Sequence, residues 1–403
     1  MKLKTKGMRV DLFEKCRQFM PIVLEHQAKG VYPYFIPLES ESGPEVVIGG
    51  RRVLMLGSNN YLGLTQHPAV KAAAKAAIDR YGSGCTGSRL LNGTLELHEE
   101  LERRLAAFMH KEAALVFTTG FQANLGAISA LADRHDTIVI DRSDHASIID
   151  GCRLSTAHVV KYRHNDMEHL ESVLKSLDGK GGVFIVADGV FSMDGDLANI
   201  PAMVRLKKRY GARLLIDDAH GIGALGKCGR GTLEVFGMEE GVDVVVGTFS
   251  KSLASIGGFV VGDKDPIEYI KHNARSMLFS ASLPPASVAA AMAALEIVVK
   301  EPERRVRLWQ NVKMMREGLE SLGFDIGNSQ SPVIPVIIGD NSQVTVFWRA
   351  LFDAGLYTNC ILSPGVPPGH ELIRTSYMAT HTKEHLQQAL DIFETVGKRI
   401  GII

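Results

Sequence analysis

The sequence predicts an α/β fold with a mostly parallel sheet in a large domain, followed by a smaller α+β domain at the C-terminus. From about residue 58 to 265, short apolar runs rich in β-branched residues alternate with segments of helical periodicity, which is typical of parallel sheets. Several of these runs end in Asp, Gly or hydroxyl residues, as buried strands do. The expected strands of this part are 114–118, 137–140, 182–187, 213–216 and 242–246.

The two ends of the chain have a different pattern. Residues 11–28 place apolar side chains at helical spacing, and 44–56 indicate a hairpin around Gly49 and Gly50. A long helix is expected from the Pro284-Pro285 pair to Lys300, then strands near 333–338 and 372–376, and a last helix from about Thr382. We therefore expect three units: an N-terminal arm (1–57), a large domain (58–285) and a small C-terminal domain (286–403).

Composition limits the classes of function. The 403 residues are 45% apolar, and 45 basic residues balance 45 acidic ones, so no electrostatic footprint for nucleic acid exists. The five cysteines are scattered, which disfavours a disulfide framework and a zinc site. No apolar run reaches the roughly 18 residues of a membrane span, and Gly7–Asp11 stand where a signal peptide would be apolar. We expect a cytoplasmic protein whose helix 11–28 docks on the protein body, with peripheral contact to the inner membrane face as the alternative.

Lys251 is the residue on which the functional prediction depends. It follows the apolar run 242–246, and the preceding run ends in Asp217. Functional groups of parallel sheets gather at the carboxyl ends of strands. An amine with a reference pKa of about 10.4 is a poor nucleophile unless burial or cations lower that value, and the apolar surroundings predict partial burial. A lysine for a Schiff base, an aspartate for a pyridinium nitrogen and nearby hydroxyls for a phosphate indicate pyridoxal 5'-phosphate (PLP). The alternative is a solvated loop lysine.

Other polar residues follow neighbouring strands. The string 118–124 opens a helix whose free N–H groups favour a phosphate, although a plain strand-to-helix turn has the same composition. His145 and His220 each follow a strand end, where a loop or core role is the alternative. Asp217 could also merely cap a turn. Arg374 lies in an apolar strand; it suits a substrate carboxylate, with edge-strand solvation as the alternative.

Three motif matches are rejected on their context. The glycines of 82–87 follow a helix rather than a strand, and those of 221–226 lead into more loop instead of a phosphate-binding helix, so neither is a dinucleotide fingerprint. His98 begins a zinc-protease-like string, but Glu102 stands where the second histidine is needed. We expect His98 on an exposed helix face.

With these residues in place, the chain resembles the α-oxoamine synthases, a branch of the fold-type I (aspartate aminotransferase-like) PLP enzymes. The resemblance runs from 58–64 through 144–151 to 372–374, almost the whole chain. The strings 247–255, 163–166 and 378–382 are most similar to the bacterial serine palmitoyltransferase branch. Gly221 departs from that branch, which generally has Ser after this histidine, and is similar to the oxononanoate and aminoketobutyrate enzymes.

The resemblance implies roles around the cofactor ring. Lys251 would form the Schiff base, His145 would stack on the ring, and Asp217 would keep the ring nitrogen protonated. Ser192 and His220 would contact the phenolic oxygen. The implied catalytic residues are thus Lys251, His145 and His220, and no metal is implied.

The resemblance also implies how the two ends of the ligands are held. Asn60 and Arg374 would bind the amino acid's carboxylate. A neighbouring subunit would contribute to the phosphate site, so the enzyme would be a homodimer. The implied phosphate ligands are Gly120, Phe121, Thr248 and Ser250 of one subunit and Ser280 of the other.

The implied reaction is a decarboxylative condensation of an amino acid with an acyl-CoA. For the branch named above, the substrates would be L-serine and palmitoyl-CoA, and the products 3-ketodihydrosphingosine, CoA and CO2, a step of sphingolipid biosynthesis. The alternatives within the family are 8-amino-7-oxononanoate synthase and 2-amino-3-ketobutyrate CoA ligase. A PLP aminotransferase is the alternative of a different class.

Overall fold

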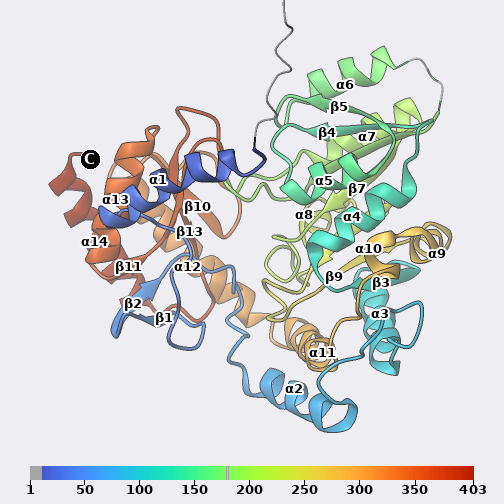
Figure 1. The fold of residues 1–403 in the computed structure, drawn as a ribbon, viewed down its shortest axis with the longest axis horizontal. Helices are drawn as coiled ribbons and strands as arrows, with labels where there is room; N and C mark the ends of the chain where they lie inside the picture. Colours follow the sequence, from blue (N-terminus) through green and yellow to red (C-terminus); the bar gives the residue numbers. More distant parts are fainter. Residues whose placement is uncertain (1–10, 178, 180) are drawn as a thin grey trace, which may run out of the picture.

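The computed structural model describes residues 11–177, 179 and 181–403 (Figure 1). The basic start of the chain, from which we argued against a signal peptide, lies largely outside these residues. Within them, the main sheet has seven strands in the order β3-β9-β8-β7-β6-β4-β5. Its strands are β3 (Ala113–Phe117), β4 (Thr137–Asp141), β5 (His158–Tyr162), β6 (Val183–Asp188), β7 (Arg213–Asp217), β8 (Val244–Thr248) and β9 (Gly258–Gly262).

The strand directions explain where functional side chains meet. β8, β7, β6, β4 and β5 pair in parallel, whereas β9 is antiparallel to both β8 and β3. The carboxyl ends of β3, β8, β7, β6 and β4 therefore lie along one edge. The helices of this part are α2 (Pro68–Tyr81), α3 (Glu96–Phe108), α4 (Gly120–Leu131), α5 (Ala146–Leu154), α6 (Met167–Ser176), α7 (Ile200–Tyr210), α8 (Thr232–Phe236), α9 (Lys264–Asn273) and α10 (Arg275–Leu278).

Helices cover both faces of this sheet because its strands are apolar on both sides. In β8, Val244 and Val246 belong to one core cluster and Val245 to the other, as alternation along a strand requires. The first cluster includes side chains of α4, α5, α9 and α10; the second includes α3, α6 and α7. A continuous apolar strand buried on both faces is what predicted a parallel sheet, and the prediction of an α/β fold is confirmed.

The N-terminal and C-terminal parts share smaller sheets. β1 and β2 form the predicted hairpin, and β11 pairs in parallel with β2. β10, β13 and β12 form an antiparallel sheet. Figure 1 shows the blue N-terminal strands beside the red C-terminal part. The bounds are α1 (Glu14–Ala28), β1 (Glu45–Ile48), β2 (Arg51–Met55), α11 (Pro285–Lys300), α12 (Glu303–Ser321), β10 (Val333–Ile337), α13 (Asn341–Asp353), β11 (Leu356–Tyr357), β12 (Asn359–Ile361), β13 (Leu372–Ser376) and α14 (Lys383–Ile400). The division at residues 57 and 285 stays a prediction.

Two expectations need correction. His98 lies on α3 but is fully buried, because its ring contacts the Leu283 carbonyl (2.9 Å) and the Leu95 amide (3.0 Å); this tertiary contact is invisible in the sequence. Helix α1 forms as expected, and Arg349 of α13 holds the carbonyl of Gly30 just beyond it. However, α1 has no buried residue, so its apolar face does not dock on its own chain. Among the residues described, no helix is long and apolar enough to cross a bilayer.

Candidate active site

A pocket of about 340 Å³ opens at the carboxyl edge of the main sheet. The turns that follow β3, β4, β6, β7 and β8 supply its walls, so the sheet itself determines which side chains meet there. The structure brings together most of the residues predicted from the sequence: Gly120, Phe121, His145, Ser192, Asp217, His220, Thr248, Ser250 and Lys251. Asn60, Arg374 and Ser280 do not line the pocket.

Lys251 stands three residues beyond the end of β8. Its side chain is half-buried in the pocket wall. This burial lowers the pKa of Lys251 from 10.5 to about 8, against the opposing pull of the Asp217 and Asp188 carboxylates. An amine with this pKa is a nucleophile near neutral pH and can also carry a proton.

Asp217 is the last residue of β7, and each of its two carboxylate oxygens accepts a hydrogen bond. Its Oδ1 accepts from the Ala219 amide (3.0 Å), and its Oδ2 accepts from Asn124 Nδ2 (2.6 Å). Asn124 also donates to Ser147 Oγ (2.8 Å). The sequence analysis did not single out Asn124 or Ser147. A signal existed for Asn124, because it lies four residues after Gly120 and so on the same face of the helix.

The end of the pocket that is formed by the start of α4 favours the binding of an anion. α4 begins at Gly120, and Thr119 caps it by accepting from the Gln122 amide (3.1 Å). The N–H groups of the first turn and the helix dipole favour negative charge there. Thr248 and Ser250 present hydroxyls 2.8 Å apart at the same place. A Cβ on Gly258 would lie 2.5 Å from the Gly120 Cα, so only glycine lets β9 approach the helix start.

His145 lies at the pocket mouth, where its ring meets the Phe121 ring edge to face (6.3 Å between centroids). The loop that carries it is anchored by buried carboxylates. The His145 amide donates to Asp188 Oδ2 (2.7 Å), and the Asp188 amide donates to Asp144 Oδ1 (2.9 Å). Burial raises the pKa of both Asp144 and Asp188. The sequence analysis missed Asp188, because the expected strand stopped at residue 187.

His220 connects the pocket to Arg374. Its Nδ1 lies 2.7 Å from the hydroxyl of Tyr61. Burial lowers the pKa of His220, with the Lys251 and Arg374 cations acting in the same direction, so the ring is neutral. Burial also raises the pKa of Tyr61 to about 12, which keeps it a phenol. Tyr61 was not predicted as a site residue.

Arg374 projects from β13 toward the loop that carries Ser192. Its Nε donates to the Ser192 carbonyl (2.5 Å), Nη1 to Ser376 Oγ (3.0 Å) and Nη2 to Asn59 Oδ1 (3.0 Å). Asn59, rather than Asn60, therefore meets the guanidinium.

The side chain of Asn60 is used within its own turn. It donates to Thr65 Oγ1 (2.8 Å) and accepts from the Leu64 amide (3.1 Å). Ser280 also lies apart from the pocket of its own chain, where its hydroxyl accepts from Gln122 (3.1 Å). Neither residue is brought to the pocket by a single copy.

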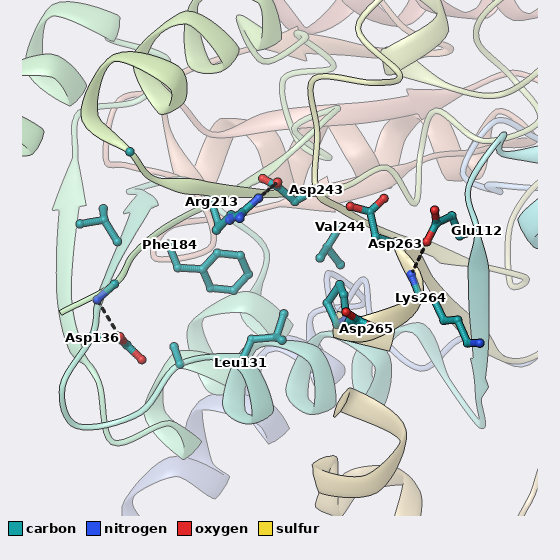
Figure 2. Close-up of a pocket in the computed structure, with 15 residues that line it drawn as sticks. Glu112, Leu131, Asp136, Phe184, Arg213, Asp243, Val244, Asp263, Lys264 and Asp265 are labelled. Carbon is teal, nitrogen blue, oxygen red and sulfur yellow. Dashed lines mark hydrogen bonds and ion pairs between the residues drawn. The ribbon is translucent and has the colours of Figure 1, made fainter. Parts of the chain in front are cut away.

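A larger pocket of about 850 Å³ lies at the opposite, amino-terminal edge of the sheet (Figure 2). Some of its charged groups bind one another or the backbone: Arg213 pairs with Asp243 (2.9 Å), and the Lys264 amide donates to Glu112 (2.9 Å). None of the predicted site residues is among its described lining residues. Size therefore does not identify the reaction site; the clustered amine, carboxylates and imidazoles at the carboxyl edge do.

Comparisons with known proteins show the family of the chain. Residues 51–393 match the family model "Aminotransferase class I and II". The chain is 50% identical to serine palmitoyltransferase of Sphingobacterium spiritivorum over 94% of this chain and 96% of that protein. It is 47% identical to 8-amino-7-oxononanoate synthase of Thermoanaerobacter pseudethanolicus, over 94% and 96%.

Among solved structures, the chain is similar to SPT (serine palmitoyltransferase) with a PLP internal aldimine. The TM-score is 0.95 at 40% identity, and the match covers 98% of this chain and 100% of the other. The predicted resemblance and the fold-type I assignment are confirmed. The chain belongs to the aminotransferase class I and II family, and within that family to the α-oxoamine synthases.

Proposed function

We propose that this chain is a PLP-dependent C-acyltransferase that condenses L-serine with palmitoyl-CoA and releases CO2, CoA and 3-ketodihydrosphingosine. The observation that carries the proposal is that a half-buried Lys251, whose pKa is about 8, and Asp217 line one pocket. The substrates follow from the 50% identity to a serine palmitoyltransferase over nearly the whole of both chains.

The residues of the pocket fit PLP. A volume of about 340 Å³ lies in the range of small-ligand sites, roughly 300–1,000 Å³. Lys251 offers the amine, Asp217 the acceptor for a pyridinium N–H, and the start of α4 with Thr248 and Ser250 the donors for a phosphate. When bound, PLP supplies an electron sink that stabilises negative charge at the α-carbon of an amino acid.

The protein's own groups handle the protons of the reaction. Lys251 accepts the α-proton of serine as a neutral amine, because its pKa of about 8 makes that form available near neutral pH. Asn124 keeps Asp217 oriented toward the ring nitrogen through the 2.6 Å bond. Ser192 and the neutral His220 face the phenolic oxygen, and Tyr61 holds the His220 ring.

Arg374 binds the serine carboxylate. Its guanidinium is held by the Ser192 carbonyl and Asn59, and a planar fork suits a carboxylate. Asn60 contributes by closing the turn that presents Asn59, since its amide is bonded to Thr65 and Leu64. His145, which lines the pocket, would pack against the ring of a bound cofactor and could donate to the oxygen of the thioester as charge develops there.

The site is completed by a second copy of the chain. Leu91 and Phe279 are 78% and 74% exposed in a single copy, and Phe121 at the pocket mouth is also exposed. The loops of Leu91 and Phe279 are joined by the bond from the Ser282 amide to the Gly87 carbonyl (2.9 Å). A homodimer covers this apolar surface and brings Ser280 to the phosphate of its neighbour.

The protein acts in the cytoplasm, and α1 gives it peripheral contact with the inner face of the membrane. Phe13, at the N-cap of α1, and Phe19 and Leu24 within it are exposed and form an apolar face that no described residue of the chain buries. An isolated helix of 15 residues is marginal in water, so this face needs a surface to rest on.

The alternative product, 8-amino-7-oxononanoate, is favoured by Gly221 and by the 47% identity to a synthase of that class. The structure offers a packing reason for Gly221, however. A Cβ there would lie 2.1 Å from Asp218 Oδ1, and Asp218 is buried and bonded to the Thr232 amide (2.7 Å). Gly221 is therefore required by Asp218, and its presence does not discriminate between substrates.

The test is a substrate screen with the purified, PLP-loaded protein. L-serine, L-alanine and glycine are each combined with palmitoyl-CoA, a pimeloyl thioester and acetyl-CoA, and free CoA thiol and CO2 are measured. We expect release only with L-serine and palmitoyl-CoA at an appreciable rate. Preference for alanine with the pimeloyl thioester would overturn the proposal in favour of the alternative, and formation of an oxo acid without thiol release would indicate an aminotransferase.

A further inference from the structure

The turn 163–166, between β5 and α6, lies behind the pocket and has no part in the function proposed above. We propose that His164 in this turn is a positioning residue. It links Asp196 to Asp141 and so fixes the loop that contains Ser192, whose backbone carbonyl binds Arg374. The inference rests on the proposed function in one respect, since the group it positions is the arginine for the substrate carboxylate.

His164 contacts a carboxylate on each side of its ring. Nδ1 lies 3.0 Å from Asp141 Oδ1, at the end of β4, and Nε2 lies 3.2 Å from Asp196 Oδ2, in the loop after β6. Two carboxylates on two ring nitrogens require both nitrogens to donate, so the ring is an imidazolium. Burial opposes this charge, but the bonds to Asp141 and Asp196 prevail and raise the pKa of His164 to about 10. The Phe191 ring meets the imidazolium edge to face (4.4 Å between centroids).

Asn165 repeats the same connection one residue later. Its amide donates to Asp141 Oδ2 (2.7 Å), and its Nδ2 donates to the Leu197 carbonyl (2.9 Å) and to Asp196 Oδ2 (3.2 Å). The backbone of Asn165 has φ +49°, a left-handed conformation that Asn tolerates better than most residues. This conformation allows two consecutive residues to face the same loop.

The loop 189–197 contains the residues that contact Arg374 and the turn before β13. Ser192 lines the pocket, and its carbonyl accepts from Arg374 Nε (2.5 Å). Two residues on, Asp194 Oδ1 lies 2.6 Å from His370 Nε2, which links the same loop to the turn before β13. Arg374 donates to a backbone carbonyl in this loop. If the loop becomes more mobile, the guanidinium is no longer held in position to bind the substrate carboxylate.

A metal site is the competing explanation for the same residues. His164, Asp194 and Asp196 offer ligand atoms that all lie within 4.8 Å of one another. Both carboxylates already have protein partners, however: Asp194 Oδ1 lies 2.6 Å from His370 Nε2, and Asp196 Oδ2 accepts from Asn165 Nδ2 (3.2 Å). The geometry therefore favours the brace.

The test compares His164→Asn and Asp196→Asn, singly and together, with Arg163→Gln as the matched control. Asparagine at 164 retains a donor for Asp141 but cannot reach Asp196. Arg163 lies in the same turn, with a side chain 62% exposed and paired only with Asp166. We expect each of the two single variants to raise the KM for L-serine, and the dissociation constant from its spectral titration, roughly 10-fold. The kcat should change little, because the lost contact binds ground state and transition state alike.

Two further readouts separate the brace from general damage. Amide hydrogen exchange of residues 189–197 in the cofactor-free protein should accelerate in His164→Asn and not in Arg163→Gln. The double variant should be no worse than either single one, since both remove the same pair. Additive effects, unchanged exchange with unchanged KM, or loss of serine binding after dialysis of the wild type against EDTA would each overturn the inference. If the wild type shows no spectral response to serine, the proposed substrate is wrong, and the exchange measurement alone decides on the brace.

Discussion

The pKa of Lys251 gives a prediction whose magnitude follows from the structure. At pH 7, an amine with a pKa of about 8 is neutral in about one molecule in eleven, against about one in 3,000 at the ordinary value of 10.5. The buried lysine should therefore capture an aldehyde about 300-fold faster than an exposed lysine of equal intrinsic reactivity. The capture rate should rise with pH up to about 8 and level off above it, since the neutral amine is the nucleophile.

The assay mixes cofactor-free protein with PLP between pH 6 and 11, traps the adduct with borohydride and quantifies the labelled peptide. Nα-acetyl-lysine, measured under the same conditions, corrects for the titration of the aldehyde itself. Two variants should move the midpoint in opposite directions. Asp217→Asn removes an anion that raises the pKa of Lys251, so the midpoint should fall; Arg374→Gln removes a cation that lowers it, so the midpoint should rise.

The reasoning would be refuted by a wild-type midpoint above about 10, the range of a solvated lysine. It would equally fail if both variants moved the midpoint the same way, because the two charges act on the ammonium with opposite signs. A labelled peptide that does not contain residue 251 would remove the basis of the proposed function.

Three other substitutions test separate parts of the site. Arg374→Ala should raise the KM for L-serine on the order of 100-fold, because losing one side of a buried charge-assisted pair costs about 2–5 kcal/mol; a change below 3-fold would contradict its assigned role. Asn124→Asp replaces the amide that donates to Asp217 (2.6 Å) with a second carboxylate, and the two like charges repel each other. PLP binding, measured by absorbance titration, should weaken at least about 10-fold at pH 8. Retained affinity would mean that Asp217 does not pair with the ring. Gly221→Ser should destabilise the protein by about 1–3 kcal/mol in chemical unfolding without changing its preference among amino acids, and should cost less in an Asp218→Ala background; a switch of substrate would restore Gly221 as a specificity signal.

The sequence allowed the main sheet and most of the pocket to be predicted because both depend on local pattern. Apolar runs followed by polar turns locate strand ends, and strand ends of one direction share an edge. β5 escaped prediction because it is a short edge strand that includes exposed residues such as His158 and Lys161. β9 escaped although β8 precedes it by only a short loop, because its other partner, β3, is far away in the sequence.

The remaining misses depend on tertiary contacts. Asn59 and Asn60 are adjacent and chemically identical, and only the conformation of their turn decides which amide meets Arg374. His98 lies on a helix whose other polar residues are mostly solvated, yet it is buried against the Leu283 carbonyl. No periodicity in the sequence reports either contact.

The residues proposed to bind the cofactor and those proposed to bind the substrate differ in what holds them in place. Gly120 and Asn124 are one helical turn apart on α4, so the anion end of the pocket and the support of Asp217 move as one rigid body. Lys251 and Asp217 follow adjacent paired strands, and their spacing is set by the sheet. Ser192 has no such support, because it lies four residues beyond β6 in a loop, and Arg374 comes from a different sheet. The contacts of His164 with Asp196 and with Asp141, at the end of β4, are the ones that we propose tie the Ser192 loop to the main sheet. The pocket residues carried by the main sheet are thus fixed by the fold, whereas, on our proposal, the placement of Arg374 depends on His164.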